Sequence, residues 1–231
     1  MGAVQHGESA LRSIRRRNLR EEAVEALRAA ILGGELEPGS IHSAVSLAEH
    51  LGVSPTPVRE AMLELARSGL VEVLPNRGFR VTVVDDQDLR ETWELRLLLE
   101  VPSLKLVSEH AAGKELDVLE RPLNALEVAA RRNDVPAFLV ADREFHLRLL
   151  ALTGNDRLVG IVAGLRDQTR IVGLQSLAAA HALERTAAEH RPILEALRAG
   201  EVLDAQRLMT SHLEHTRDLW AGSVAAQSPA D

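Results

Sequence analysis

The chain contains no cysteine, and only 2% of its 231 residues are aromatic. Without cysteine, neither a disulfide framework nor a thiolate metal site is possible. So few aromatic residues, in a chain that is 45% hydrophobic, favour a helical protein over a β-sandwich. No apolar run reaches the roughly 18 residues of a membrane-spanning helix. No apolar signal core follows the arginines near the N-terminus. We therefore expect a helical, cytoplasmic protein.

Basic residues are too few to balance the acidic ones, and the formal net charge is −7. Residues 1–84 hold 10 basic and 10 acidic side chains, whereas residues 85–231 hold 17 basic and 24 acidic ones. The acidity therefore belongs to the second part of the chain. The neutral first part is less basic than a typical nucleic-acid-binding module, so locally placed arginines would have to supply any attraction to DNA.

The first part of the chain combines three helical patterns with a two-strand pattern. Apolar residues recur at helical spacing after Leu19, and Gly33-Gly34 ends that pattern. Ser54 suits the N-cap of the third helix, and prolines fit its first turn, where a missing N–H costs little. Alternating β-branched segments then surround a Pro-Asn-Arg-Gly turn. We predict helices at 19–32, 44–51 and 54–68 and strands at 70–74 and 79–84.

Beyond an acidic run at residues 85–88, the chain has helical patterns throughout. The run marks a domain boundary, and its charge suits the N-terminus of the helix that follows. Short connections between the helices imply antiparallel neighbours in one bundle. We predict six helices, near 86–112, 115–132, 134–153, 155–178, 181–199 and 201–221.

These patterns define a mainly α fold class. We expect an N-terminal winged helix-turn-helix, with three helices and a β-hairpin wing, followed by an all-α antiparallel bundle of about six helices. The expected domains are residues 14–84 and 85–222, with disordered tails at residues 1–13 and 223–231.

A helix-turn-helix places the N-terminal residues of its second helix near base edges in the major groove. Here these residues are Ser54, Thr56 and Arg59. Arg59 is positioned to reach a guanine edge or a phosphate, and the two hydroxyls can donate to phosphates near the positive helix end. The alternative is that Arg59 and Glu60 form a solvated helix face. At the wing tip, we expect Asn76, Arg77 and Gly78 to reach the DNA backbone or the minor groove.

One aspartate and three histidines form a second candidate constellation. Asp142 and His146 are four residues apart and share a helix face, while His190 and His212 lie in the fifth and sixth predicted helices of the bundle. A bundle can direct such side chains to one interior point, and this set suits a divalent transition metal. The spacing alone equally fits solvated helix faces or a hydrogen-bonded core histidine.

Arg96 lies within a leucine-rich run of the first bundle helix, LRLLLE. An arginine buried in such a run needs a partner. Glu100, four residues further on, can serve as that partner, and a bound carboxylate can do so as well, because a guanidinium group recognises carboxylates through two parallel hydrogen bonds.

The chain resembles the GntR family of bacterial transcription regulators. The resemblance is carried by LRAAILGGELEPGS and LAEHLGVSPTPVREAMLELARSGLVEVLPNRGF, and by the acidic boundary that follows them. The helical second part resembles the FCD type of the FadR subfamily, and a count of six helices suggests its VanR-like branch. The resemblance implies a homodimer that reads a pseudo-palindromic operator and responds to a small organic acid, with repressor the favoured mode.

The resemblance also implies roles for individual bundle residues. Many FCD domains bind a metal through one Asp and three His, and the segments DREFH, EHRPIL and SHLEH match those positions. It follows that zinc, nickel, manganese or iron is held by the four side chains of Asp142, His146, His190 and His212. By the same carry-over, Arg96 holds the effector carboxylate. His215 is expected at the surface or behind the ligands.

Two features of the chain raise questions about these carried-over roles. Relatives commonly have a basic residue where this chain has Val45, and often an arginine where it has Pro55, so Arg59, Arg77 and the N-terminal arginines at 15–17 must contribute more. Pro192 follows His190 closely. If Thr186 caps that helix, with Glu189 completing a capping box, Pro192 is expected to bend it and to shift His190.

The sequence alone also allows three other interpretations of the bundle. A metal-dependent hydrolase would need an open coordination position, but no additional general base stands at a motif spacing and the DNA-reading first part argues against it, so we do not expect an enzyme. A metal sensor would use the ion itself as its signal. In the third case the four candidate ligands bind no metal.

Overall fold

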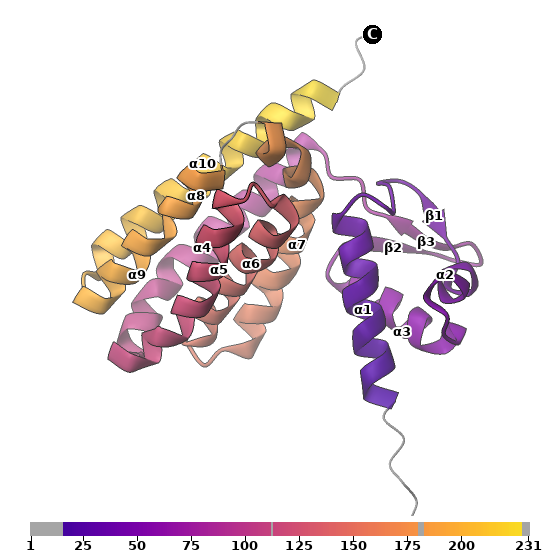
Figure 1. Cartoon of the computed structure of the whole chain (residues 1–231), viewed down its shortest axis with the longest axis horizontal. Helices are drawn as coiled ribbons and strands as arrows, with labels where there is room; N and C mark the ends of the chain where they lie inside the picture. Colours follow the sequence, from indigo (N-terminus) through magenta and orange to yellow (C-terminus); the bar gives the residue numbers. More distant parts are fainter. Residues whose placement is uncertain (1–15, 112, 180–182, 228–231) are drawn as a thin grey trace, which may run out of the picture.

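The computed structural model describes residues 16–111, 113–179 and 183–227 and shows two helical domains, joined just before Asp86 (Figure 1). The N-terminal domain comprises α1 (Arg16–Leu32), β1 (Ile41–His42), α2 (Ala44–Leu51), α3 (Pro55–Arg67), β2 (Val71–Leu74) and β3 (Gly78–Val81). The C-terminal bundle comprises α4 (Asp86–His110), the 3-10 helix η1 (Gly113–Leu119), α5 (Glu120–Arg131), α6 (Val135–Ala151), α7 (Asp156–Ala179), α8 (Leu183–Ala188), α9 (His190–Ala199) and α10 (Val202–Gln227). This mainly α architecture confirms the predicted fold class.

The N-terminal domain is built around the contact between α1 and α3. Its apolar core holds Leu27 and Ile31 of α1 together with Val58, Met62 and Leu65 of α3, all nearly inaccessible to water. Because these residues recur at helical spacing, each helix buries one face and leaves its other face in solvent. The exposed N-terminal end of α3 is therefore held rigidly by the core behind it.

The start of α3 is set by proline rather than by a capping hydroxyl. Ser54 occupies the N-cap position with an extended backbone, as predicted, but its side chain makes no capping hydrogen bond. An N-cap hydroxyl accepts from the N–H of the second or third helical residue, and the third residue here is Pro57, which has none. Pro55 instead fixes the first helical turn through its restricted φ. The Ser54 hydroxyl oxygen therefore accepts no capping bond, and the whole group is available to a partner outside the helix.

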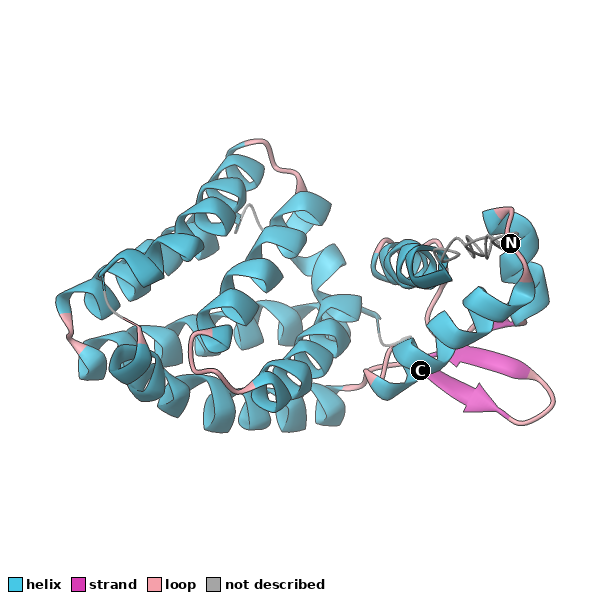
Figure 2. Ribbon diagram, turned by 90° about the horizontal axis from the view of Figure 1, so that it is seen from below, coloured by secondary structure: helices cyan, strands magenta, loops and turns pink. Residues whose placement is uncertain are grey.

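The wing is a three-stranded antiparallel sheet with strand order β1-β3-β2, rather than the two-stranded hairpin we predicted. The added strand is only Ile41–His42, too short for a periodic pattern, and it pairs with Phe79 and Arg80 of β3. At the tip, Asn76 adopts a left-handed backbone conformation with φ 60°, and the turn points away from the bundle (Figure 2).

The bundle begins with a reciprocal cap at the predicted acidic boundary. The Asp85 side chain accepts from the backbone N–H groups of Gln87 and Asp88, at 2.8 Å each. The Asp88 carboxylate accepts from the Asp85 N–H at 3.1 Å. This capping box satisfies N–H groups that have no partner within the helix and places negative charge at its positive end.

Two of the predicted bundle helices are each divided. The predicted helix 115–132 begins as the 3-10 segment η1 before α5 starts. The predicted helix 181–199 breaks into α8 and α9 at Glu189. Pro192 explains the second break, because it has no N–H for the carbonyl of Ala188, four residues earlier. Thr186 lies inside α8, so the expectation that it caps a continuous helix is wrong.

The C-terminal helix is longer than predicted, since α10 continues through the expected tail to Gln227. Residues 228–231 and the predicted tail at 1–13 lie outside the described residues. Among the helices of the described ranges, none is both long and apolar enough to cross a membrane.

The wing geometry predicts an unequal response to alanine at two glycines. Gly78 has φ 112°, and an added Cβ would lie 2.3 Å from the carbonyl oxygen of His42 in β1. Gly34 also has a positive φ, of 78°, but nothing lies within 4 Å of its added Cβ. We expect Gly34→Ala to cost about 1 kcal/mol and Gly78→Ala at least twice as much. Hydrogen exchange at the β2 and β3 amides measures the difference, and equal protection in the two variants would contradict it.

Candidate functional site

Four side chains that are far apart in the sequence converge inside the bundle. Asp142 and His146 come from α6, His190 from the start of α9 and His212 from α10. Each offers one ligand atom, and these atoms all lie within 4.8 Å of one another. The three imidazoles are at most 1% exposed, and the Asp142 side chain is 15% exposed. The structure therefore gathers one carboxylate and three buried imidazoles, a donor set that suits a divalent transition metal.

The ring nitrogens are arranged in an inner and an outer set. Nε2 of His190 lies 3.1 Å from Oδ1 of Asp142 and 3.2 Å from Nε2 of His146. Nε2 of His212 is buried without a hydrogen-bond partner in the described part of the chain. A buried polar nitrogen without a partner is costly. An ion held at this point would supply that missing interaction.

The outer nitrogens of all three rings face carboxylate or carbonyl oxygens, and those of His190 and His212 are within hydrogen-bonding geometry. Nδ1 of His146 lies 3.2 Å from Oε2 of Glu100. Nδ1 of His190 lies 2.9 Å from the carbonyl of Thr186, and Nδ1 of His212 lies 2.9 Å from Oε2 of Glu189. Metal-binding histidines typically donate their second N–H to a carboxylate or carbonyl in this way. This outer set, which the sequence did not reveal, is consistent with three imidazoles whose Nε2 atoms serve as ligands.

The electrostatic environment favours the protonation states that metal ligands need. Burial, and then the charge of Arg166, lowers the pKa of His146 well below its usual range. Burial and the neighbouring His190 do the same to the pKa of His212. Burial opposes the charge of Asp142, but the hydrogen-bond contact with His190, and then the nearby His146 and Arg166, outweigh it and hold the Asp142 pKa well below its usual range. The pKa shifts therefore favour an ionised carboxylate at Asp142 and neutral imidazoles at His146 and His212, as metal binding requires.

Arg96 is paired with Glu100, as one of its two sequence-based interpretations required. It is 1% exposed, and its Nε donates to Oε1 of Glu100 at 2.8 Å. Arg166 of α7 binds the other oxygen of the same carboxylate, with Nη2 2.6 Å from Oε2. Burial disfavours the charged form of Glu100, but Arg166 and then Arg96 outweigh it and hold its pKa well below its usual range.

Sequence reasoning missed Arg166, although it links the two halves of the site. In addition to its contacts with Glu100, its Nη1 donates to Oδ2 of Asp142 at 3.1 Å. The side chain is 4% exposed. Its position in α7 matched no motif. The available signal was that Glu100, Asp142 and Arg166 each lie on the inward-facing side of a different helix.

Two of the four candidate ligands, Asp142 and His212, line one small cavity together with Arg96, and its volume is about 20 Å³. The lining residues are Arg96, Phe138, Leu139, Asp142, Arg166, Thr186, His212 and Thr216. A space of this size holds about one water molecule. An organic acid could enter only if the bundle opened around it.

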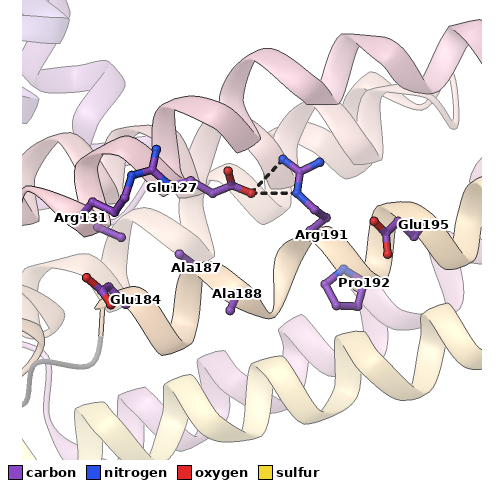
Figure 3. Close-up of a pocket in the computed structure, with 9 residues that line it drawn as sticks. Glu127, Arg131, Glu184, Ala187, Ala188, Arg191, Pro192 and Glu195 are labelled. Atoms are coloured by element: carbon purple, nitrogen blue, oxygen red, sulfur yellow. Dashed lines mark hydrogen bonds and ion pairs between the residues drawn. The ribbon is translucent and has the colours of Figure 1, made fainter.

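A larger open pocket lies elsewhere on the bundle, between α5 and the α8–α9 turn (Figure 3). Its volume is about 440 Å³, and the ion pair between Arg191 and Glu127 spans it at 2.8 Å. Its lining mixes charges of both signs with alanines and includes none of the four candidate ligands. Size alone therefore does not identify the site, because the convergent polar chemistry lies in the smaller cavity.

The predicted DNA-reading residues lie on the surface of the N-terminal domain. Ser54, Thr56 and Arg59 are exposed at the start of α3. Asn76 and Arg77 are exposed at the wing tip, where Gly78 is partly buried. Among the described residues, none forms an ion pair with Arg59 or Arg77. Val45, where relatives are expected to carry a basic residue, is 55% exposed at the start of α2.

Comparison with known proteins matches both domains. Residues 19–81 match the family described as "Bacterial regulatory proteins, gntR family", and residues 91–215 match the "FCD domain". A Streptomyces ambofaciens protein, "Uncharacterized HTH-type transcriptional regulator in unstable DNA locus", is 33% identical over 208 residues, covering 87% of this chain and 85% of that protein.

Two further comparisons extend the match. The "Probable D-xylose utilization operon transcriptional repressor" of Paenarthrobacter nicotinovorans is 30% identical, covering 79% of this chain and 80% of that protein. The solved structure of "E. coli McbR/YncC" superimposes with a TM-score of 0.78 and 26% identity, covering 88% of this chain and 97% of that one.

The shared carboxylate of Glu100 predicts a large effect on stability. Glu100→Gln removes the carboxylate that two buried guanidinium groups share and leaves Arg166 with Asp142 alone, and breaking a buried pair typically costs about 3–5 kcal/mol. Glu144→Gln removes a carboxylate from ion pairs with Arg121 and Arg148, but Glu144 is 31% exposed, and we expect at most about 1 kcal/mol. Urea unfolding followed by the fluorescence of Trp93, which packs against the bundle core, measures both losses. Equal losses would contradict the assignment of Glu100 as the central anion.

Proposed function

Because the chain belongs to the GntR family of DNA-binding transcription regulators, with an FCD domain behind its helix-turn-helix, we propose that it is a repressor controlled by a small carboxylate metabolite. In this proposal, a divalent metal held in the bundle forms part of the effector site. The observation that carries the proposal is the convergence of Asp142, His146, His190 and His212 within 4.8 Å, beside the buried Arg96.

On the DNA side, α3 enters the major groove, with Ser54, Thr56 and Arg59 at its leading end. Support comes from their exposure and from the lack of a capping bond at Ser54. Asn76, Arg77 and Gly78 bring the wing tip to the backbone or the minor groove. Because Pro55 and Pro57 remove two N–H donors from the helix end, backbone contacts to phosphate are fewer than at an ordinary helix N-terminus.

In the bundle, the four candidate ligands would hold zinc first, with nickel, manganese or iron as alternatives. The fit rests on the unpartnered Nε2 of His212 and on the acceptors bonded to the outer nitrogens of His190 and His212, while Glu100 faces the outer nitrogen of His146 at 3.2 Å. A bound divalent ion would supply positive charge and an open coordination position to an incoming carboxylate. Arg96 and Arg166 line the same cavity and offer guanidinium donors to that group.

The effector must also open the bundle, since the cavity is too small for an organic acid. An effector changes DNA affinity only to the extent that it prefers one arrangement of the protein. We propose that the effector prefers the opened bundle. In this arrangement the DNA-reading domains no longer have the placement that binding to the operator requires.

A homodimer reads the two halves of a pseudo-palindromic operator. Support for a second copy comes from the outer face of α4, where Leu95, Leu98 and Leu106 are 46%, 70% and 40% exposed. Together with the exposed Pro102, they follow helical spacing and form an apolar stripe. Such stripes mark interaction surfaces in soluble proteins.

Zinc titration of metal-free protein, prepared without a His-tag, tests the ligand set. We expect one tightly bound zinc per chain in the wild type, with a raised Tm, because an ion that binds only the folded state stabilises it. Asp142→Asn and His212→Ala should each lower zinc affinity by at least about a hundredfold, beyond the effect of losing an outer acceptor. His110→Gln, at the exposed end of α4, is the control. Unchanged zinc affinity in the two ligand variants would contradict the site.

Arg59→Ala tests the DNA-binding assignment. The probe is the duplex that wild-type protein selects from a random-sequence library. One lost arginine contact costs about 1–3 kcal/mol, and a dimer loses it twice, so we expect no detectable gel shift at moderate salt. Arg67→Ala, at the exposed C-terminal end of the same helix, should bind as wild type does. Retained binding in Arg59→Ala would contradict the assignment.

A further inference from the structure

The helix α1 ties the DNA-reading helix to the rest of the molecule. Its buried face packs against α3 in the core of the N-terminal domain, and Arg20 of α1 forms an ion pair with Glu64 of α3. On the other side, α1 faces the bundle (Figure 1). Any displacement of α1 relative to the bundle therefore moves α3 with it.

One buried aspartate of the bundle holds α1. Asp167 of α7 has a side chain that is 1% exposed, and its Oδ2 forms an ion pair with Nη1 of Arg28 in α1. Arg143 of α6 binds the same carboxylate, with Nε 2.7 Å from Oδ1 and Nη2 3.1 Å from Oδ2. We call Arg28, Asp167 and Arg143 the interdomain bridge.

Contact between the domains is loose beside this bridge. An open cleft of about 460 Å³ separates α1 from α6, with Arg28 and Leu32 on one wall and Val140, Arg143 and Leu147 on the other. Apolar side chains do not close this gap. A change in a small number of polar contacts can therefore alter how the domains sit.

The bridge lies one residue away from the candidate metal site on both of its bundle helices. Asp142 of α6 pairs with Arg166 of α7 at 3.1 Å, inside the cavity. The next residues along each helix, Arg143 and Asp167, form the second pair at 2.7 Å. Both pairs join α6 and α7, but α6 carries the acidic residue in the first pair and the basic residue in the second. A shift of Asp142 or Arg166 is thus carried directly to the bridge.

The following residue of α7 reaches the recognition helix itself. Nε2 of Gln168 lies 3.5 Å from the carbonyl of Ser68, which ends α3. A Cβ added at the neighbouring Gly69 would lie 2.0 Å from the same Nε2, so Gln168 fills the space above this turn. Three consecutive residues of α7 therefore contact the candidate site, α1 and the end of α3.

We propose that the interdomain bridge couples occupancy of the candidate metal site to the placement of the DNA-reading domain. Occupancy of the metal site moves Asp142 relative to Arg166. The neighbouring ion pair between Arg143 and Asp167 moves with them. Because Asp167 also binds Arg28, the change reaches α1 and, through it, α3. This proposal rests on the proposed function. It assigns to Asp167 and Arg28 a role in transmission, separate from binding of either metal or DNA.

The test measures how zinc changes DNA affinity in wild type and in Arg28→Gln. Affinity for the library-selected duplex is determined with zinc and with a chelator, and the ratio is the coupling. Couplings between two sites are typically about 5- to 150-fold. The matched control is Arg198→Gln, which breaks ion pairs with Asp117 and Glu120 at 2.6 Å within the bundle and does not touch α1.

We expect Arg28→Gln to bring the ratio close to one while its zinc affinity, measured without DNA, stays within twofold of wild type. Arg198→Gln should keep the wild-type ratio. A wild-type ratio in Arg28→Gln would overturn the bridge alone and leave the proposed function intact. A ratio of one in the wild type would overturn the coupling as well, whereas failure of the wild type to select any duplex would overturn the proposed function.

A distance measurement tests the same proposal without DNA. Because the chain has no cysteine, spin labels can be placed at introduced cysteines on the exposed Glu49 of α2 and the exposed Glu201 before α10. Zinc should shift the distance between them in the wild type and not in Arg28→Gln or in Asp167→Asn. The same zinc-dependent shift in all three proteins would show that the bridge does not transmit the change.

Discussion

The carboxylate of Glu100 is the anion on which the organisation of the bundle depends. It accepts from Arg96 within its own helix and from Arg166 of α7, and it faces His146 of α6. Without it, Arg96 and Arg166 would lose the carboxylate that they share, and loss of a partner for buried charge costs several kcal/mol. While Nη2 of Arg166 binds Glu100, Nη1 donates to Asp142 and orients it. His146 turns Nδ1 toward Glu100 and Nε2 toward the other candidate ligands. The geometry of the candidate ligands thus follows from a charge network that surrounds them.

Much of the fold could be predicted because it depends on local patterns. The positions of α2 and α3 followed from apolar spacing, from Ser54 and from the prolines, and the acidic boundary marked the start of α4. What was missed depends on contacts between distant segments. The strand Ile41–His42 exists only because β3 pairs with it. The break at Glu189 is instead a local effect of Pro192, which we expected to bend the start of one helix rather than to divide it into α8 and α9.

The candidate site divides in the same way. Asp142 and His146 could be paired by their spacing of four residues, and the resemblance to FCD domains pointed to His190 and His212. Arg166 belongs to no motif, and Glu189 was considered only as part of a capping box. Their roles depend on which face of α7 and which side of the turn between α8 and α9 point inward, and periodicity alone does not fix this. Arg96 illustrates the limit most clearly, since its pairing with Glu100 was one of two interpretations and its contact with an effector remains a proposal.

We propose that Asp142, His146, His190 and His212 hold a metal in the protein as it exists in the cell. The most direct measurement combines elemental analysis with X-ray absorption spectroscopy of protein purified without a His-tag or chelator. The account predicts about one divalent transition metal per chain, coordinated by three imidazole nitrogens and at least one oxygen. Protein that folds and binds DNA with no metal above background, or a metal coordinated without imidazole, would contradict it.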